Sequence, residues 1–355
     1  MKIPTPLKQG GRIAVVSLSS GMLGEDFARH DIDLGIKRLK AFGLETVFMP
    51  NALKGCEYIK EHPEKRAEDL KTAFLDDSIS GIITAIGGDD TFRTIPYLME
   101  DKEFIEAVSE RPKLFTGFSD TTNNHLMFHR LGLQTFYGPC FICDLAELAD
   151  DMLPYTKESF GNYFKPVSDW VIRPSEYWYE DRTDFSPAAI GTDPVAHREE
   201  RGFELLQGSP VFSGELLGGC LESLSDMLTG ARYAEEKEVI SRYRIFPSAE
   251  EWRGKILFIE TSEEKPSPDE YRTYLESLKA AGVFANISGI ISGKPQDERY
   301  YDEYRKILPE VVADSGIPIL FNVNIGHASP RTALPYGALC TVDAGSQTIT
   351  FGQDA

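Results

Sequence analysis

The sequence lacks any run of 18 apolar residues. Its first 20 residues hold an apolar core of only five residues, from Ile13 to Ser17, and no small-residue cleavage site. A membrane-spanning helix needs about 20 apolar residues, and a secretory signal needs a longer apolar core than this one. We therefore expect no membrane partner and a cytoplasmic location.

Basic residues are also scarce, because 37 Lys and Arg stand against 56 Asp and Glu and give a formal net charge of -19. A field of that sign repels the phosphate backbone of DNA and RNA. No basic stripe in the sequence is long enough to override it. We therefore exclude nucleic-acid polymers as partners.

Cysteine and histidine are few, which limits the chemistry available for disulfides and metals. The five cysteines are odd in number and scattered through apolar contexts, which favours reduced thiols. His125 and His129 have the spacing of a metal pair, but no Glu follows His125 in the H-E-x-x-H pattern, so we interpret both as packing residues. We interpret His30, His62 and His197 as solvated, and we expect no metal and no other cofactor.

The 355 residues exceed the usual size of one hydrophobic core and favour two domains. In the first part, short apolar runs alternate with stretches of helical periodicity, which predicts a doubly wound, mostly parallel α/β sheet. A second, smaller α/β region follows later in the chain, and it ends in a predicted β-hairpin that turns at residues 343–346. The predicted strands of the first sheet are 12–19, 45–50, 81–88, 113–119 and 134–139.

Residues 150–210 lose this alternation and gather aromatic, proline and charged residues. Connections of this length are usually functional or disordered. We therefore predict an N-terminal domain over residues 1–165, a connecting region over 166–207 and a C-terminal domain over 208–355.

The segment KLFTGFSDTTNNHLMFHRLG, residues 113–132, changes at Ser119 from an apolar run to helical spacing. A serine on a tight strand-to-helix turn projects its hydroxyl above the sheet, beside the free N–H groups that begin the helix. Ser119 therefore has the context of a nucleophile, although Thr121 stands where the G-x-S-x-G motif has its second glycine. The alternative is that Ser119 or Asp120 caps the helix, a common role for both residue types.

A nucleophilic serine needs a base and an acid that orients the base. His327 follows the predicted strand 317–324 in the segment NIGHASP, where a strand end would present it to a cleft. Glu260 ends the apolar strand KILFIE, at the edge where α/β sheets build their sites. The alternative for Glu260 is that it simply begins the acidic loop ETSEE.

Several segments together resemble the LD-carboxypeptidase family of serine peptidases, and within it the microcin C self-immunity branch. They span nearly the whole chain in the family's order, and as a set they are highly specific. The matching segments are VVSLSS, AIGGDDTFR at 85–93, GFSDTT at 117–122, GELLGGCLESL at 214–224, ILFIETSEE at 256–264 and GHASPRTALPYGA at 326–338.

The resemblance implies a catalytic triad of Ser119, His327 and Glu260. His327 would take the proton from Ser119 Oγ, and Glu260 would hold the imidazole tautomer and stabilise its charged form. It also implies an oxyanion hole formed by the backbone N–H groups of Gly88 and Asp120. A homodimer is expected from the resemblance alone.

Two positions depart from the family pattern or point to one branch of it. Cys220 stands where the family often has Asn in GGNL, which alters the support at the domain junction or the wall of the site. Trp178, in SEYWYEDRTDF, matches a tryptophan that stacks on a nucleobase in the immunity branch. Its alternative role is packing under a long loop, because aromatic side chains often simply bury area.

Three functions fit these residues. The leading hypothesis is a serine peptidase that hydrolyses a small aminoacyl nucleotide or peptide of the microcin C type. The second is a muropeptide LD-carboxypeptidase of cell-wall recycling. The third is a ligand-binding protein without catalysis, which a doubly wound sheet with the segment IGGDD would also support.

Overall fold

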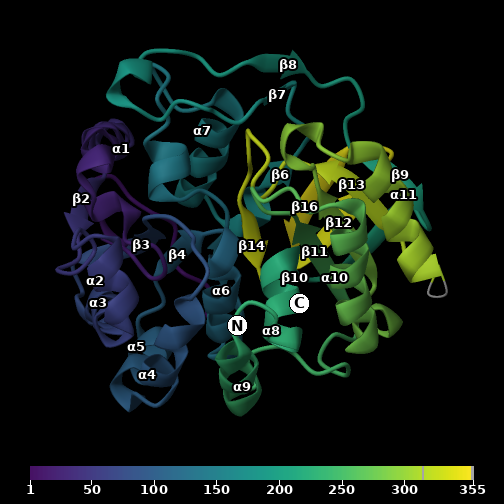
Figure 1. The fold of residues 1–355 in the computed structure, drawn as a ribbon, viewed down its shortest axis with the longest axis horizontal. Coiled ribbons are helices and arrows are strands. Elements are labelled where there is room, and N and C mark those ends of the chain that lie inside the picture. Colours follow the sequence, from purple (N-terminus) through teal and green to yellow (C-terminus); the bar gives the residue numbers. More distant parts are fainter. Residues whose placement is uncertain (314–315, 353–355) are drawn as a thin grey trace. The chain divides into compact units, whose positions relative to one another are not determined.

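A computed structural model describes residues 1–313 and 316–352 (Figure 1). The chain divides into two compact units. Unit 1 comprises Met1–Pro166 and Arg182–Pro194, and unit 2 comprises Val167–Asp181 and the chain from Val195 onward. The predicted connection, residues 166–207, is therefore shared between the two units.

Unit 1 contains the predicted doubly wound sheet. Its five parallel strands lie in the order β2-β1-β3-β4-β5, so the strand order reverses between β1 and β3. In such sheets ligands bind outside the carboxyl ends of the strands at the point of reversal. The strands are β1 (Arg12–Val16), β2 (Glu45–Phe48), β3 (Ile79–Thr84), β4 (Leu114–Gly117) and β5 (Thr135–Tyr137).

The helices of unit 1 follow the strands as the alternation predicts, and the helices Cys56–Glu61, Lys102–Glu110 and Pro154–Gly161 were not predicted. Helix α5 begins at an Asp101 cap, whose carboxylate accepts the Phe104 N–H. The helices are α1 (Arg29–Ala41), α2 (Cys56–Glu61), α3 (Pro63–Leu75), α4 (Ile95–Met99), α5 (Lys102–Glu110), α6 (Thr122–Arg130) and α7 (Pro154–Gly161), drawn purple to teal in Figure 1.

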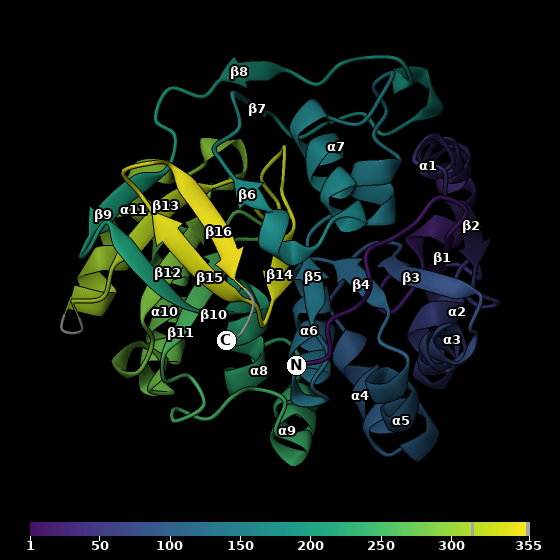
Figure 2. The same ribbon diagram turned by 180° about the vertical axis from the view of Figure 1, so that it is seen from behind.

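Unit 2 is built on a mixed sheet in the order β6-β16-β15-β10-β11-β12-β13-β9. Strands β10 to β13 run parallel, and antiparallel strands flank them on both sides. The predicted terminal hairpin is confirmed, because β15 and β16 pair antiparallel (Figure 2). The strands are β6 (Val171–Ile172), β9 (Glu204–Gln207), β10 (Val211–Cys220), β11 (Lys255–Glu260), β12 (Gly289–Gly293), β13 (Ile319–Val323), β15 (Leu339–Asp343) and β16 (Thr348–Gly352).

Further elements of unit 2 complete the fold. A two-stranded ribbon consists of β7 (Tyr177–Tyr179) and β8 (Ala196–Arg198), and β14 spans Leu334–Tyr336. The helices are α8 (Leu221–Thr229), α9 (Ala234–Tyr243), α10 (Pro268–Ala280) and α11 (Tyr301–Val312). Within the described part of the chain, no helix has the length and apolar character to cross a membrane.

Candidate active site

Ser119 lies directly after β4, on a strained turn. Its φ angle is 66°, in the left-handed region that non-glycine residues rarely occupy and that costs about 1–3 kcal/mol. Its backbone N–H donates to Tyr137 Oη at 3.0 Å. A side chain on Gly117 would put a Cβ 2.2 Å from Thr84 Oγ1, which explains the glycine two residues before the serine. This is the backbone geometry of a nucleophile turn.

The capping alternative for Ser119 and Asp120 does not fit the local contacts. Neither the short 3-10 turn Ser119–Thr121 nor α6 has a side-chain hydrogen bond at its N-cap. Phe118 and Thr121 occupy the two N-cap positions instead.

The glycine pair after β3 passes beside Ser119. A Cβ on Gly87 would lie 2.7 Å from Ser119 Cβ and 3.0 Å from Ser119 Oγ, so a side chain there would crowd the hydroxyl. Gly88 has a φ of 152°, and a Cβ on it would lie 2.3 Å from Ser19 Oγ. The predicted oxyanion residue Gly88 therefore sits in a turn that requires glycine, one residue from the close approach to Ser119.

Asp120 is fully buried, and its carboxylate joins loops that follow three neighbouring strands. Oδ2 accepts the Ser19 hydroxyl at 2.7 Å and the Thr91 N–H at 2.8 Å, and Oδ1 accepts Asn123 Nδ2 at 3.1 Å. Burial raises the pKa of Asp120 from 3.8 to about 6, although these hydrogen bonds pull it the other way. The side chain thus fixes the turn that carries Gly88 against the turn that carries Ser119.

A buried ion pair supports the same turn from α3. Arg66 is completely buried and donates to both carboxylate oxygens of Asp90, at 2.6 and 3.3 Å. It also donates to the Leu18 carbonyl at 3.0 Å. Such bidentate pairs are geometrically specific, and losing one partner leaves an uncompensated buried charge. Arg66 therefore ties the loop after β1 to the loop after β3.

The second predicted pair, Glu260 and His327, meets in unit 2. Glu260 ends β11 and is 2% exposed, and its Oε2 accepts both His327 Nδ1 at 2.8 Å and the His327 backbone N–H at 3.1 Å. Burial alone would lower the pKa of His327. The charges and hydrogen bonds of Glu260 and Glu263 outweigh that effect and raise it to about 10.

Gly326 shows how tightly the backbone closes over Glu260. Its φ is 68°, and a Cβ would lie 2.0 Å from Glu260 Cδ. A Cβ on Gly293, at the end of β12, would lie 2.8 Å from Glu260 Cβ. The glycine before the histidine is therefore needed for close approach to the carboxylate.

His327 has a further acidic neighbour that sequence reasoning missed. Its Nε2 lies 2.9 Å from Glu263 Oε2, although the Glu263 side chain is 63% exposed. The contact with His327 lowers the pKa of Glu263 to about 2, against the effect of burial. The acidic loop ETSEE contained this residue, but nothing in the sequence distinguished it from Glu264.

Cys220, the departure from the family pattern, ends β10 and is buried. Its thiol donates to Glu222 Oε2 at 3.3 Å, and burial raises the pKa of the thiol. Glu222 Oε1 in turn accepts the Ser262 N–H and hydroxyl, both at 2.8 Å. Burial and the charge of Glu260 raise the pKa of Glu222. Cys220 therefore helps to hold the carboxylate that anchors the loop after β11.

Trp178 lies on β7 opposite His197 on β8. The two rings stack with centroids 4.2 Å apart and planes 17° apart, and Lys294 Nζ lies 5.1 Å from the tryptophan centroid. The half-buried indole therefore packs within unit 2, against His197 and Lys294, and a nucleobase stacked on it would share the ring with these two neighbours. His197 is not simply solvated, because it supports this stack and contacts Glu180 Oε1 at 2.8 Å.

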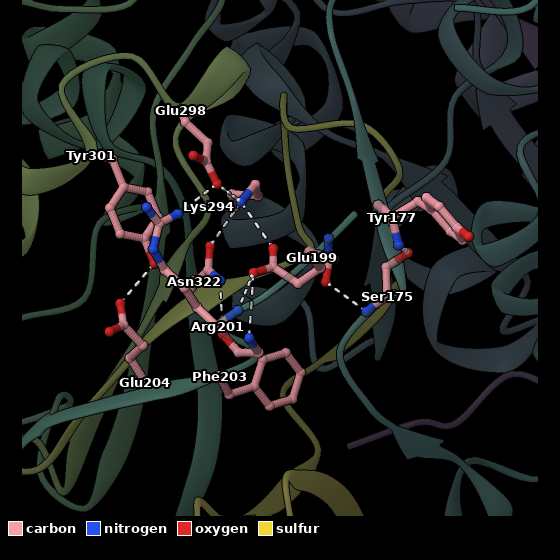
Figure 3. A network of polar contacts seen from close by, with 12 residues as sticks. Ser175, Tyr177, Glu199, Arg201, Phe203, Glu204, Lys294, Glu298, Tyr301 and Asn322 are labelled. Atoms are coloured by element: carbon pink, nitrogen blue, oxygen red, sulfur yellow. Dashed lines mark hydrogen bonds and ion pairs between the residues drawn. The ribbon is translucent and has the colours of Figure 1, made fainter. Parts of the chain in front are cut away.

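A buried cation anchors the β7–β8 ribbon, as Figure 3 shows. Lys294 follows β12, and its side chain is 1% exposed. Its Nζ donates to Glu199 at 3.0 Å, to Glu298 at 2.5 Å and to Asn322 at 3.3 Å. The ribbon also contacts the loop of His327, because the Tyr179 N–H donates to the Ser329 carbonyl at 2.8 Å.

The contacts confirm the packing role predicted for His125 and contradict the solvated role predicted for His30. His125 is fully buried, with Nδ1 2.7 Å from Thr135 Oγ1 and Nε2 2.9 Å from the Gly117 carbonyl. Burial lowers its pKa to about 4, so it is a neutral packing residue. His30 is not simply solvated, because its Nε2 contacts the Phe185 carbonyl at 3.0 Å. Among the residues described, no cluster of three or more His, Cys, Asp or Glu could hold a metal ion.

The predicted site residues thus form two groups. Ser119, Asp120 and Gly88 come together in unit 1, and Glu260 and His327 come together in unit 2, with Trp178 on the ribbon tied to the histidine loop. Sequence reasoning missed the supporting residues Arg66, Glu222, Glu263 and Lys294. Glu222 and Lys294 are charged residues beside apolar strands, which was a signal, but Arg66 and Glu263 lie in charged segments where nothing distinguished them.

Comparison with known proteins gives a consistent set of relatives. The crystal structure of an MccF-like protein from Streptococcus pneumoniae in complex with AMP is 50% identical, with a TM-score of 0.93, over 97% of this chain and 99% of that one. The probable murein peptide carboxypeptidase of Bacillus subtilis is 27% identical over 98% of this chain and 93% of its own length. The microcin C7 self-immunity protein MccF of Escherichia coli is 26% identical over 98% of this chain and 96% of its own length.

Two family models match the two halves of the chain. Residues 13–138 match the LD-carboxypeptidase N-terminal domain, and residues 213–342 match the LD-carboxypeptidase C-terminal domain. The first range contains Ser119, and the second contains Glu260 and His327. The chain belongs to the LD-carboxypeptidase family of serine peptidases.

Proposed function

We propose that this hydrolase cleaves the acyl bond of a small aminoacyl nucleotide through a triad of Ser119, His327 and Glu260. The observation that carries the proposal is the MccF-like protein that binds AMP, because it is 50% identical over nearly the whole chain. The strained turn at Ser119 and the buried Glu260–His327 pair support it from this chain's own geometry. A homodimer in the cytoplasm is part of the same proposal, as the resemblance to the microcin C branch implies.

The proposed reaction proceeds in two acyl transfers. Ser119 Oγ gives its proton to His327 Nε2 and bonds to the acyl carbon, while Glu260 holds the Nδ1–H and stabilises the imidazolium. The N–H groups of Gly88 and Asp120 receive the oxyanion. The bond to the leaving group then breaks as His327 returns the proton to the leaving atom. Water, deprotonated by the same imidazole, hydrolyses the acyl-serine ester and releases the acid.

In this proposal Trp178 provides the platform for the base. Its ribbon is tied to the His327 loop through Tyr179 and Ser329, which supports a base site near the catalytic histidine. Stacking on an aromatic ring tolerates different bases, because every base offers a π face. The anchoring of the ribbon by Lys294 would keep the platform fixed before substrate arrives.

A muropeptide LD-carboxypeptidase is the second candidate. The relative from Bacillus subtilis favours it, since it aligns over 98% of this chain. The two candidates differ in the leaving group, which is a nucleotide in one case and a terminal D-amino acid in the other. Product analysis on one substrate of each kind separates them.

The test compares the wild type with Ser119→Ala on aspartyl sulfamoyl adenosine and on an LD-tetrapeptide. We expect the wild type to prefer the nucleoside substrate. We expect Ser119→Ala to lower kcat by roughly 10^6, as loss of a triad nucleophile does in subtilisin, with an unchanged melting curve. A fluorophosphonate probe should label the wild type and not the variant. Activity within tenfold of the wild type would refute the triad, and a preference for the tetrapeptide would favour the second candidate.

A further inference from the structure

The Glu263 carboxylate contacts the ring nitrogen of His327 that must be free in the proposed reaction. Nδ1 of His327 contacts Glu260, so Nε2 is the nitrogen that would receive the Ser119 proton. Glu263 Oε2 lies 2.9 Å from that Nε2. With a carboxylate at each ring nitrogen, both nitrogens act as donors and the imidazole is protonated. A protonated imidazole cannot act as the general base until it releases the Nε2 proton to solvent, and departure of Glu263 favours that release because it removes one of the two carboxylates that raise the pKa of His327.

The loop that carries Glu263 is fixed by polar contacts on both sides of this residue, and the Glu263 side chain is exposed to solvent. Glu222 holds Ser262 through its backbone N–H and its hydroxyl. Glu264 pairs with Arg232 at 2.9 Å, and Arg232 also lies 3.5 Å from Asp226. Glu263 is 63% exposed, so rotation of its side chain would free Nε2 without movement of the backbone.

We propose that Glu263 is a specificity-determining residue, which passes from His327 to a free ammonium group beside the scissile carbonyl of the substrate. This inference rests on the proposed function. In the free protein water can solvate the Glu263 carboxylate once it leaves the imidazolium, but a bound substrate that excludes this water makes an unpaired carboxylate costly unless the substrate supplies a cation. Glu260 and Glu222 are further carboxylates near the histidine, and Arg232, whose charge also acts on Glu263, is already shared by Glu264 and Asp226. Arg331, in the loop of His327, donates to Ser329 Oγ at 3.2 Å. The substrate itself is therefore the source of the cation.

An aminoacyl nucleotide carries such a group, because its amino acid has a free α-ammonium one carbon from the acyl carbon. In a muropeptide the corresponding nitrogen is part of a peptide bond and carries no charge. Glu263 would therefore favour the first substrate class over the second. It would also couple binding to activation, because His327 becomes a free base only when the ammonium takes its partner away.

The experiment uses two substrates that differ only at the α-nitrogen, alanyl sulfamoyl adenosine and its N-acetyl derivative, in which an uncharged amide replaces the ammonium group. We expect wild-type kcat/KM to favour the free amine, and Glu263→Gln to reduce that ratio by about 10- to 100-fold, the usual effect of a hydrogen bond to a charged group. Glu264→Gln is the matched control, since Glu264 lies in the same loop but pairs with Arg232. An unchanged ratio in Glu263→Gln, or an equal reduction in Glu264→Gln, would overturn the inference.

Two further measurements separate this inference from the proposed function. Calorimetry on Ser119→Ala and on Ser119→Ala/Glu263→Gln measures the affinity for each of the two compounds, and so gives the ratio of affinities without turnover. The 15N shifts of His327 report its protonation directly, and Glu263→Gln should bring its pKa below the present value of about 10, because one of its two carboxylate partners is lost. A wild type that hydrolyses neither compound would refute the proposed function. A binding ratio that does not depend on Glu263 would refute the role of Glu263.

Discussion

Replacing Asp120 by Asn should stabilise the protein relative to the wild type progressively as the pH rises from 4 to 7, and should make it less active. The carboxylate is fully buried, and its pKa rises from 3.8 to about 6 because burial penalises the charged form. That rise corresponds to roughly 3 kcal/mol. An acid whose pKa is raised by folding contributes stability below the unfolded value, and that contribution is lost as the pH rises through the folded value. The cost of ionised Asp120 is therefore absent near pH 4 and complete near pH 7.

Asparagine removes this cost, but it has one oxygen where Asp120 uses two. Oδ2 accepts from Ser19 and from the Thr91 N–H, and Oδ1 accepts from Asn123. The variant cannot keep all three bonds, so the turn that carries Gly88 should shift relative to Ser119. Misplacement of a catalytic group by about 1 Å costs on the order of 100-fold in rate. We expect kcat/KM to fall by about 10- to 100-fold.

The assay is urea unfolding followed by circular dichroism from pH 4 to 7.5, with kcat/KM measured in parallel. The unfolding free energy of Asp120→Asn minus that of the wild type should rise by about 3 kcal/mol over this range. Asp69→Asn is the control, because burial also raises the pKa of Asp69 to about 6 while its carboxylate contacts Asn51, in the loop after β2. The unfolding free energy of Asp69→Asn minus that of the wild type should also rise with pH, but this variant should retain activity. If the difference in unfolding free energy between Asp120→Asn and the wild type did not change with pH, the reasoning would be refuted. An equal loss of activity in Asp69→Asn would also refute it.

Two other substitutions test the second half of the site. Gly326→Ala should lower kcat by at least 100-fold with little change in fold, because its Cβ would lie 2.0 Å from Glu260 Cδ. Gly254→Ala has a similar φ of 73° with no atom near the new Cβ, so it measures backbone strain alone, and a comparable loss of activity there would exclude our explanation. Trp178→Ala should weaken binding of AMP by roughly 1–3 kcal/mol and leave cleavage of an LD-tetrapeptide unchanged. Equal losses on both ligands, together with a lower melting temperature, would assign Trp178 to packing instead.

Much of the fold could be predicted, because the apolar and polar pattern along the sequence matches the strands, turns and helix ends of the structure. The buried strands of unit 1 read as short apolar runs, and the terminal hairpin turns where Asp343 begins a polar turn between alternating strands. Helix α10 begins with the capping box of Ser267 and Glu270, which is visible in the sequence. These features depend on contacts between residues close in the chain.

The connection at 166–207 shows the opposite case. Residues 182–194 pack with unit 1, while the stretches on either side pack with unit 2 and form the β7–β8 ribbon. The ribbon is held by Lys294 and Asn324, which are more than 90 residues away in sequence. No local periodicity marks such a segment, because its stability comes from distant polar partners. The sequence therefore predicts only an irregular connection there.

The predicted catalytic residues and the residues that support them differ in the same way. Glu260 ends β11, and Ser119 and His327 lie in the loops that follow β4 and β13, where the sheet architecture itself indicates a site. Glu263 and Glu264 are identical neighbours in one acidic loop, yet one contacts His327, 64 positions later, and the other contacts Arg232, 32 positions earlier. Which of two adjacent carboxylates reaches the imidazole is decided by how Glu222 anchors Ser262, and that anchor lies 40 positions away. The sequence thus shows that this loop carries carboxylates, but only the tertiary structure shows which carboxylate contacts His327.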